Sequence, residues 1–187
     1  MPLTAPLSAA ARLARIRRLS RWMGWFCQAL MLALPVALLA YWASTPDAEL
    51  AQQGNLPAAA LRNTLQPWQR WACAAIAAVP MGMLLMGLAQ ARGCFVQFAL
   101  GQVFTVQATV RLRRFAAWVA GTALAAIAAG ALTSVLLTLH NPTGSRYLSV
   151  GVNSNHVMTL FFAAMVWLMA EIVDQGQVLA EENAAFV

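Results

Sequence analysis

The sequence predicts an all-α membrane protein built as a four-transmembrane-helix bundle. The prediction rests on four long apolar runs, at about residues 23–43, 71–91, 115–139 and 157–173. At a rise of about 1.5 Å per residue, a helix of about 21 residues spans the roughly 30 Å hydrocarbon core of a bilayer. The first three runs contain no charged residue, and the fourth contains only Glu171, near its end. Charges at mid-bilayer are costly, so their absence indicates membrane-spanning segments.

The composition agrees with this fold class. With 61% hydrophobic and 10% charged residues, the chain does not resemble a soluble domain. The connections between the runs are too short to bury cores of their own, so we expect residues 1–187 to form a single membrane domain.

The basic residues predict the orientation in the membrane. All twelve are arginines, and nine of them fall before the first run or between the second and third. The nine are Arg12, Arg15, Arg17, Arg18, Arg21, Arg92, Arg111, Arg113 and Arg114. Because positive residues accumulate on the cytoplasmic side, both termini and the middle loop are expected in the cytoplasm. This charge is explained by topology and attraction to anionic lipid, and we expect no direct contact with nucleic acid.

The segment before the first run is predicted to be a separate surface helix. Ala9–Arg21 alternates arginines with leucine and isoleucine, so a short amphipathic helix along the inner surface is expected. Trp22 and Trp25 then mark the inner interface, and Tyr41 and Trp42 mark the outer one.

The middle connection predicts a cytoplasmic helical hairpin extension over Phe95–Arg114. The residues after the second run are apolar, so the second helix should continue beyond the bilayer. Gly101 is expected to end that helix as a C-cap, and Thr105 to cap the third helix, which begins at Val106.

Small residues dominate the third run, which we expect to be the central packing element. Gly121 with Ala125, and Ala126 with Gly130, are spaced as pairs that let helix backbones approach closely. The cysteines Cys27, Cys73 and Cys94 show no metal-binding spacing and are expected to pack as small apolar residues.

The last external segment predicts a short β-hairpin. Asn141-Pro142-Thr143-Gly144 suits a type I turn, and both flanks, 137–140 and 146–152, favour strand. Ser154 is then expected to cap the fourth helix.

Two stretches give the chain a resemblance to the DUF2975 family of small bacterial four-span membrane proteins. The first is Phe98-Ala99-Leu100-Gly101-Gln102-Val103-Phe104-Thr105, followed by Val110-Arg111-Leu112-Arg113-Arg114. The second is Leu139-His140-Asn141-Pro142-Thr143-Gly144, followed by Leu148-Ser149-Val150, then Ala180-Glu181-Glu182-Asn183 and Phe186-Val187. Gln107 and Ala108 depart from the acidic residue that often follows the Phe-Thr pair. The resemblance implies the bacterial inner membrane, and pairing with a small helix-turn-helix DNA-binding protein. It carries no catalytic residues.

The histidines and the carboxylates near the membrane are further candidate site residues. His140 and His156 flank the outer hairpin, but two histidines are too few for a typical zinc site, so we expect no metal and no cofactor. Glu171 and Asp174 end the fourth run; they suit either a proton relay or, as we expect, pairing with Arg92, Arg111, Arg113 or Arg114. No hydrolase, phosphate-loop or dinucleotide motif is present, so an enzyme is not expected.

The sequence therefore favours a non-enzymatic regulatory or scaffolding partner of a cytoplasmic protein, such as a transcription regulator. The alternative is a small transporter, channel or accessory subunit that acts as a homo-oligomer. For the first function, the predicted partner-binding residues lie in the hairpin and in the acidic tail. They are Phe95, Phe98, Phe104, Arg111, Arg113, Arg114, Glu181, Glu182 and Asn183.

Overall fold

The computed structural model contains four long helices and, over the residues it describes, no strand. The described residues are 9–47, 49–50, 56, 65–101, 105–141, 146 and 148–185, with the backbone alone for 9–13 and 177–185. The helices are α1 (Ala9–Ser44), α3 (Pro67–Ala99), α4 (Val106–Leu137) and α5 (Ser154–Ala185). Each is long and apolar enough to cross a membrane, which confirms the four predicted spans and defines a multi-pass membrane protein.

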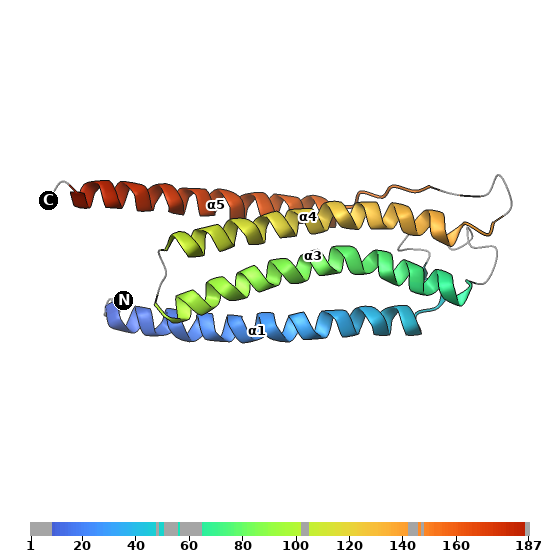
Figure 1. Ribbon diagram of the computed structural model, residues 1–187, viewed down its shortest axis with the longest axis horizontal. Helices are drawn as coiled ribbons and strands as arrows, with labels where there is room; N and C mark the ends of the chain where they lie inside the picture. Colours follow the sequence, from blue (N-terminus) through green and yellow to red (C-terminus); the bar gives the residue numbers. More distant parts are fainter. Residues whose placement is uncertain are drawn as a thin grey trace, which may run out of the picture.

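The helices alternate in direction, so the chain has two distinct ends (Figure 1). Both termini and the α3–α4 turn lie at one end, which we call the basic end because it carries the arginines from Arg15 to Arg21 and from Arg92 to Arg114. The connections from α1 to α3 and from α4 to α5 lie at the other, which we call the far end.

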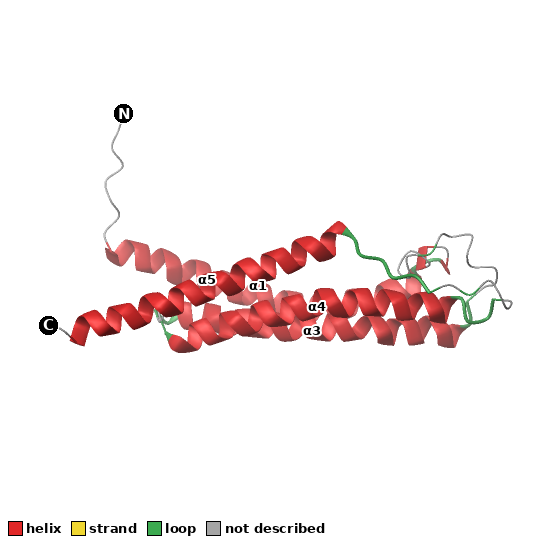
Figure 2. Cartoon of the chain, turned by 90° about the horizontal axis from the view of Figure 1, so that it is seen from above, coloured by secondary structure: helices red, strands yellow, loops and turns green. Residues whose placement is uncertain are grey.

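The helices pack in chain order rather than as a closed bundle. Over the described residues, the extensive contacts are α1 with α3, α3 with α4, and α4 with α5. Figure 1 shows this as a row, and Figure 2 shows α5 crossing the α3–α4 pair obliquely, with its start at Ser154 well away from that pair. The third predicted span, α4, therefore shares the central position with α3, rather than being the single central packing element that we expected.

Buried residues recur at seven-residue spacing along α4. On α4 the buried positions include Thr109, Ala116, Ala123, Gly130 and Leu137, each seven residues from the next. A seven-residue repeat keeps one face of a helix against its neighbour along its whole length. The predicted small pairs were less informative: of their four residues, Gly130 alone is buried, although Gly121 does make room for Met83 of α3.

The predicted surface helix at the N-terminus is wrong, because α1 is continuous from Ala9 to Ser44. The basic segment extends the first span along the same axis. No glycine or proline separates the two parts between Ala9 and Arg21, and alanine, leucine and arginine all favour helix, so the helix has no local reason to end.

The predicted β-hairpin at the far end is also not supported, since the described residues there form no strand. Helix α4 runs to Leu137, and the Thr138 hydroxyl donates a hydrogen bond to the Ser134 carbonyl over 2.8 Å. The returning segment bonds to this helix end instead, because the Ser149 amide donates to Ser134 Oγ at 2.9 Å. Residues 142–145 of the predicted turn lie outside the described residues.

The cap of α5 is Asn153 rather than the predicted Ser154. The amide of His156 donates to Asn153 Oδ1 over 3.1 Å, and the amide of Asn153 donates to His156 Nδ1 over 3.3 Å. Two amides that the start of a helix leaves without partners are thus satisfied reciprocally, as in a capping box.

Candidate functional site

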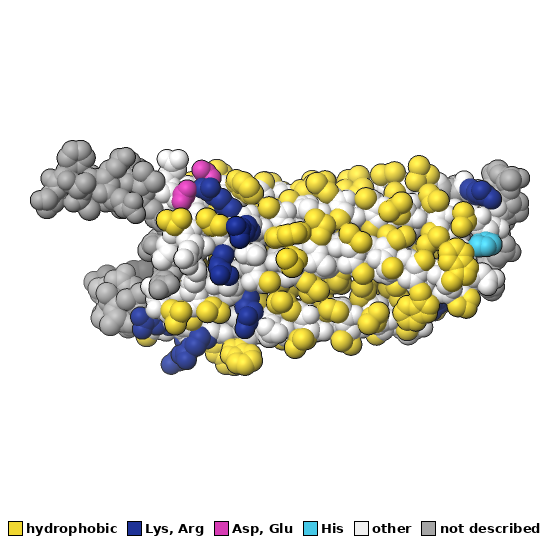
Figure 3. Space-filling model, viewed as in Figure 1, with side chains coloured by type: hydrophobic (Ala, Val, Ile, Leu, Met, Phe, Trp, Pro, Cys, Tyr) yellow, Lys and Arg dark blue, Asp and Glu magenta, His cyan; other side chains and the backbone are white. Residues whose placement is uncertain are grey.

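The basic end gathers charged side chains from all four helices. Figure 3 shows arginines in a band across this end, with carboxylates beside them at one edge and a mostly hydrophobic surface over the remaining length of the helices. The arginines with described side chains in this band include Arg18, Arg21, Arg92, Arg111, Arg113 and Arg114, and we call them the arginine collar.

Helix α4 begins where the sequence predicts, whereas the C-cap of α3 is Leu100 rather than the predicted Gly101. Leu100 is the C-cap of α3, and Gly101 follows with φ +87°, a conformation that glycine adopts without strain. Thr105 caps α4, accepting a hydrogen bond from the Ala108 amide at 3.3 Å. A Cβ added to Gly101 would lie 2.7 Å from Arg17 Nη2, so α1 packs closely over this turn.

A branched ion pair holds α5 against α4. Arg113 Nη2 lies 2.9 Å from Glu171 Oε2 and 2.7 Å from Asp174 Oδ2. The predicted pairing of these carboxylates with a collar arginine is thus confirmed, and Arg113 is the partner. Arg92, another of the predicted partners, is on α3 and therefore one helix further from α5 in the row.

Four of the remaining collar residues line two grooves between helices. The α1–α3 groove has a volume of about 290 Å³, and the α3–α4 groove one of about 450 Å³. The first is lined by Ser20, Arg21, Gly24, Trp25, Gln28, Arg92, Phe95, Val96, Ala99 and Leu100. The second is lined by Gln90, Val106, Gln107, Val110, Arg111 and Arg114.

The structure therefore separates the predicted partner-binding residues. Phe95 lines the α1–α3 groove, Arg111 and Arg114 line the α3–α4 groove, and Arg113 is used in the ion pair. Phe98 lies on the last turn of α3 and is half-buried. Phe104 lies outside the described residues. Glu181, Glu182 and Asn183 lie on α5, where the backbone alone is described.

Contacts between the ends of α3 and α4 fix the α3–α4 groove. The Cys94 thiol donates to the Ala108 carbonyl at 3.4 Å, and Gln97 Nε2 donates to Gln107 Oε1 at 3.1 Å. The Arg111 guanidinium lies over Gly93, where any Cβ would collide with it. These contacts hold the two basic side chains of this groove, Arg111 and Arg114, on a well-packed pair of helix ends.

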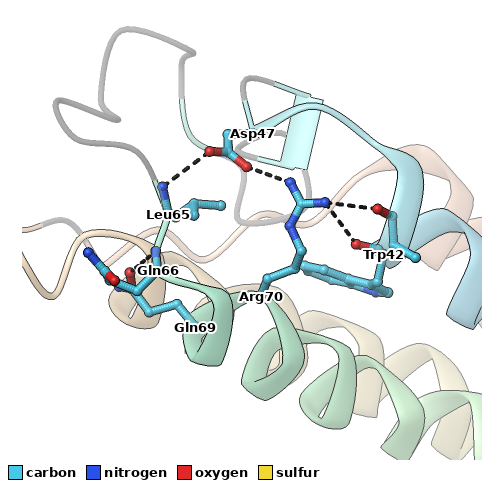
Figure 4. Close-up of polar contacts among 7 residues, drawn as sticks. Trp42, Asp47, Leu65, Gln66, Gln69 and Arg70 are labelled. Atoms are coloured by element: carbon cyan, nitrogen blue, oxygen red, sulfur yellow. Dashed lines mark hydrogen bonds and ion pairs between the residues drawn. The ribbon is translucent and has the colours of Figure 1, made fainter.

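A second polar cluster, at the far end, was missed by the sequence reasoning (Figure 4). Asp47 Oδ1 accepts from Arg70 Nη2 at 2.6 Å, and Arg70 Nη1 also donates to the carbonyls of Trp42 and Ala43. Buried Gln69 donates from Nε2 to the Leu136 carbonyl of α4 over 2.9 Å. The cluster thus joins the end of α1, the start of α3 and the end of α4.

Trp42 lies in the core beneath this cluster. It is 2% exposed and packs with Leu50, Leu56, Cys73 and Leu137, so its predicted role as an outer interface marker is wrong. The guanidinium of Arg70 and its opposite charge on Asp47 were visible in the sequence, but their spacing of 23 residues gave no local signal.

The two candidate histidines, His140 and His156, contact different residues. The His140 ring contacts Trp68 edge-on, with ring centroids 5.8 Å apart, and His156 caps α5. Among the described residues, no three or more histidine, cysteine, aspartate or glutamate side chains gather as metal ligands. All three cysteines are buried and free, consistent with their predicted packing role.

Comparisons with known proteins add nothing to this geometry. No family model, no curated protein and no solved structure matches the chain. The resemblance to the DUF2975 family stays a prediction from the quoted motifs.

Proposed function

We propose that the protein is a non-enzymatic membrane anchor whose basic end binds a soluble cytoplasmic protein and holds it at the membrane. The observation that carries the proposal is the length of α5. Its apolar run ends at Val173, yet the helix continues to Ala185. Figures 1 and 2 show this extension reaching beyond the α3–α4 turn. The eleven helical residues after Asp174 extend the helix by about 17 Å, enough to offer a soluble protein three helical turns.

The charges at the basic end support a binding role. The extension carries Glu181 and Glu182, while the α3–α4 groove beside the turn carries Arg111 and Arg114. Guanidinium groups stay charged throughout the physiological pH range, which suits them to recognition rather than proton transfer. A partner with adjacent basic and acidic patches would complement both parts of this surface.

The Arg113 ion pair supports the proposal further, because it lies where α5 leaves the apolar span. Asp174 is the second of the two carboxylates that contact Arg113. The extension of α5 therefore begins directly after its contact with α4. The partner would therefore dock against a helix whose base is fixed. The resemblance to the DUF2975 family suggests that the partner is a small helix-turn-helix regulator and that the membrane is the bacterial inner membrane.

A truncation after Asp174 tests the proposal, because it removes residues 175–187 and leaves both ion-pair carboxylates in place. Wild-type and truncated proteins are purified in mild detergent, and associated soluble proteins are identified by mass spectrometry. We expect one soluble protein to be recovered with the wild type and at least about tenfold less with the truncation, equal to about 1.4 kcal/mol.

Two further variants sharpen the comparison. Glu181→Gln with Glu182→Gln keeps the length of the helix and removes its charge, and Arg111→Gln with Arg114→Gln removes the opposite charge. Both should reduce recovery of the same protein. Full recovery with a well-folded truncation would remove the tail from the site. If the intact protein retains no soluble partner, the transporter, channel or accessory-subunit alternative takes precedence.

A further inference from the structure

We propose that the α1–α3 groove is a binding site for one anionic phospholipid. Arg21 and Arg92 would hold the phosphate group, and the lipid chains would lie against the apolar surface that continues from the groove. The site is separate from the proposed protein-binding surface, which uses the α3–α4 groove and the end of α5.

The groove combines two cationic groups with an apolar floor. Arg21 belongs to α1 and Arg92 to α3, so the two guanidinium groups come from opposite walls. Phe95, Val96 and Leu100 supply apolar surface between them. A soluble phosphate compound would leave this floor without a complementary group, whereas a phospholipid matches both parts. We therefore assign the site to a lipid rather than to a free phosphate.

The charges in the groove are not neutralised by the protein. Arg113 pairs with two carboxylates, but among the described residues no carboxylate lies within 4 Å of Arg21 or Arg92. Two positive groups on facing walls repel each other, and a phosphate between them would replace repulsion with charge-assisted hydrogen bonds. Ser20 and Gln28, also in the lining, can donate to the remaining headgroup oxygens.

The position of the groove matches the headgroup layer of a bilayer. Its arginines belong to the collar, which borders the hydrophobic surface in Figure 3. Trp25 lies at its rim with 75% of its surface exposed, and neighbouring Trp22 is 72% exposed. Exposed tryptophans concentrate at the boundary between headgroups and acyl chains. A lipid entering from the bilayer would thus meet the groove at the depth of its own phosphate.

Gly24 keeps the groove open, and this provides a test that does not alter charge. A Cβ added at Gly24 would be 4.0 Å from the nearest atom, Phe95 Cβ, so it would fit, and the further atoms of a larger side chain would extend into the groove between α1 and α3. Gly24→Leu therefore blocks the site while retaining Arg21 and Arg92. Loss of lipid binding in this variant separates a defined site from diffuse attraction to positive charge.

The experiment measures binding of phosphatidylglycerol and phosphatidylcholine to the purified full-length protein by native mass spectrometry, after removal of co-purified lipid. We expect one tightly held phosphatidylglycerol, bound at least about tenfold more tightly than phosphatidylcholine. Arg21→Gln with Arg92→Gln should remove this preference, and Gly24→Leu should weaken binding of the same lipid to a similar extent. Circular dichroism and the thermal unfolding midpoint confirm that each variant is folded.

The matched control is Arg15→Gln with Arg114→Gln, which removes the same charge from the same end but leaves the groove intact. This variant should bind phosphatidylglycerol within about twofold of wild type, as expected for weak, screened attraction at exposed sites. Equal binding of the two lipids by the wild type would overturn the proposal. So would equal losses in the groove and control double variants, or unchanged binding by a folded Gly24→Leu protein.

Discussion

At the scale of single residues, Arg113 shows how the protein manages charge next to the membrane. One guanidinium group contacts two carboxylates that are three residues apart, and so lie on the same side of α5. All three side chains are roughly a third or more exposed, at 30%, 44% and 37%. Solvent therefore screens the attraction, and the contact mainly fixes the position of α5 rather than stabilising the whole fold.

A double-mutant cycle measures this contact. Arg113→Gln, Asp174→Asn and the combined variant are compared with wild type by thermal unfolding in mild detergent. We expect a coupling of about 0.5–1 kcal/mol that decreases at high salt, because the pair is partly exposed. Arg114→Gln is the control, since Arg114 is exposed and has no carboxylate within 4 Å among the described residues. Zero coupling, or an equal effect of the control, would show that the pair does not form.

At the scale of elements, the packing of α3 on α4 depends on the absence of side chains. Gly87 is buried in this seam, and a Cβ placed there would lie 3.4 Å from the Cβ of Trp118. Further atoms beyond that Cβ would have to displace α4. Because lipid tails are as apolar as the helices, close packing of this kind is what favours association of helices in a membrane.

Substituting two glycines on the same helix tests the seam. Gly87→Val should destabilise the protein by about 1–3 kcal/mol relative to Gly82→Val, because overpacking forces the backbones apart. Gly82 has open space around the position of its Cβ, so this second variant carries the same change in helix propensity without the collision. The measurement is the thermal unfolding midpoint in detergent. Equal midpoints for the two variants would mean that Gly87 does not set the approach of α3 to α4.

At the scale of elements, the sequence predicts the ends of helices better than the contacts between distant segments. Helix ends are determined by a few adjacent residues, so the predicted cap at Thr105 is confirmed and the predicted end of α3 at Gly101 is one residue beyond its C-cap, Leu100. The strand prediction at the far end failed because Ser134 supplies a hydrogen bond to Ser149 from a different segment. The burial of Trp42 depends on residues from three helices, and aromatic character alone does not distinguish a core tryptophan from one at the membrane interface.

In the candidate site too, the sequence does not show which distant residues meet. The sequence indicated that carboxylates of the fourth span pair with arginines of the middle loop, because both groups fall on one side of the membrane. It left four arginines open, and the contact of α4 with α5 selects Arg113 among them. The α1–α3 groove was not predicted, since it joins residues about 70 positions apart and only the packing of α1 on α3 brings Arg21 and Arg92 together.

At the scale of the whole molecule, the open row leaves α1 and α5 with wide apolar faces. On α5, the buried positions among residues with described side chains are Ala163 and Ala170, while Phe161 and Phe162 are mostly exposed. Such surfaces are suited to contact with lipid chains, and the sides of the molecule therefore belong in the bilayer.

The orientation of the molecule is predicted to place the basic end in the cytoplasm, because nine of the twelve arginines belong to that end. Reporter fusions at residue 103, in the α3–α4 turn, and at residue 145, in the far-end connection, test this directly. A cytoplasmic reporter should be active at residue 103 and inactive at residue 145. The same signal at both sites, or the reverse pattern, would contradict the predicted topology.

The continuity of α1 determines how far each N-terminal arginine lies from the membrane. Its 36 residues form a rod of about 54 Å, longer than the roughly 30 Å of a hydrocarbon core, so the basic segment stands away from the bilayer. Arg15 is about 9 Å further along the axis than Arg21, and the Debye length in physiological salt is about 8 Å. We therefore expect a graded series of charges, in which Arg21 is attracted to the headgroups more strongly than Arg15.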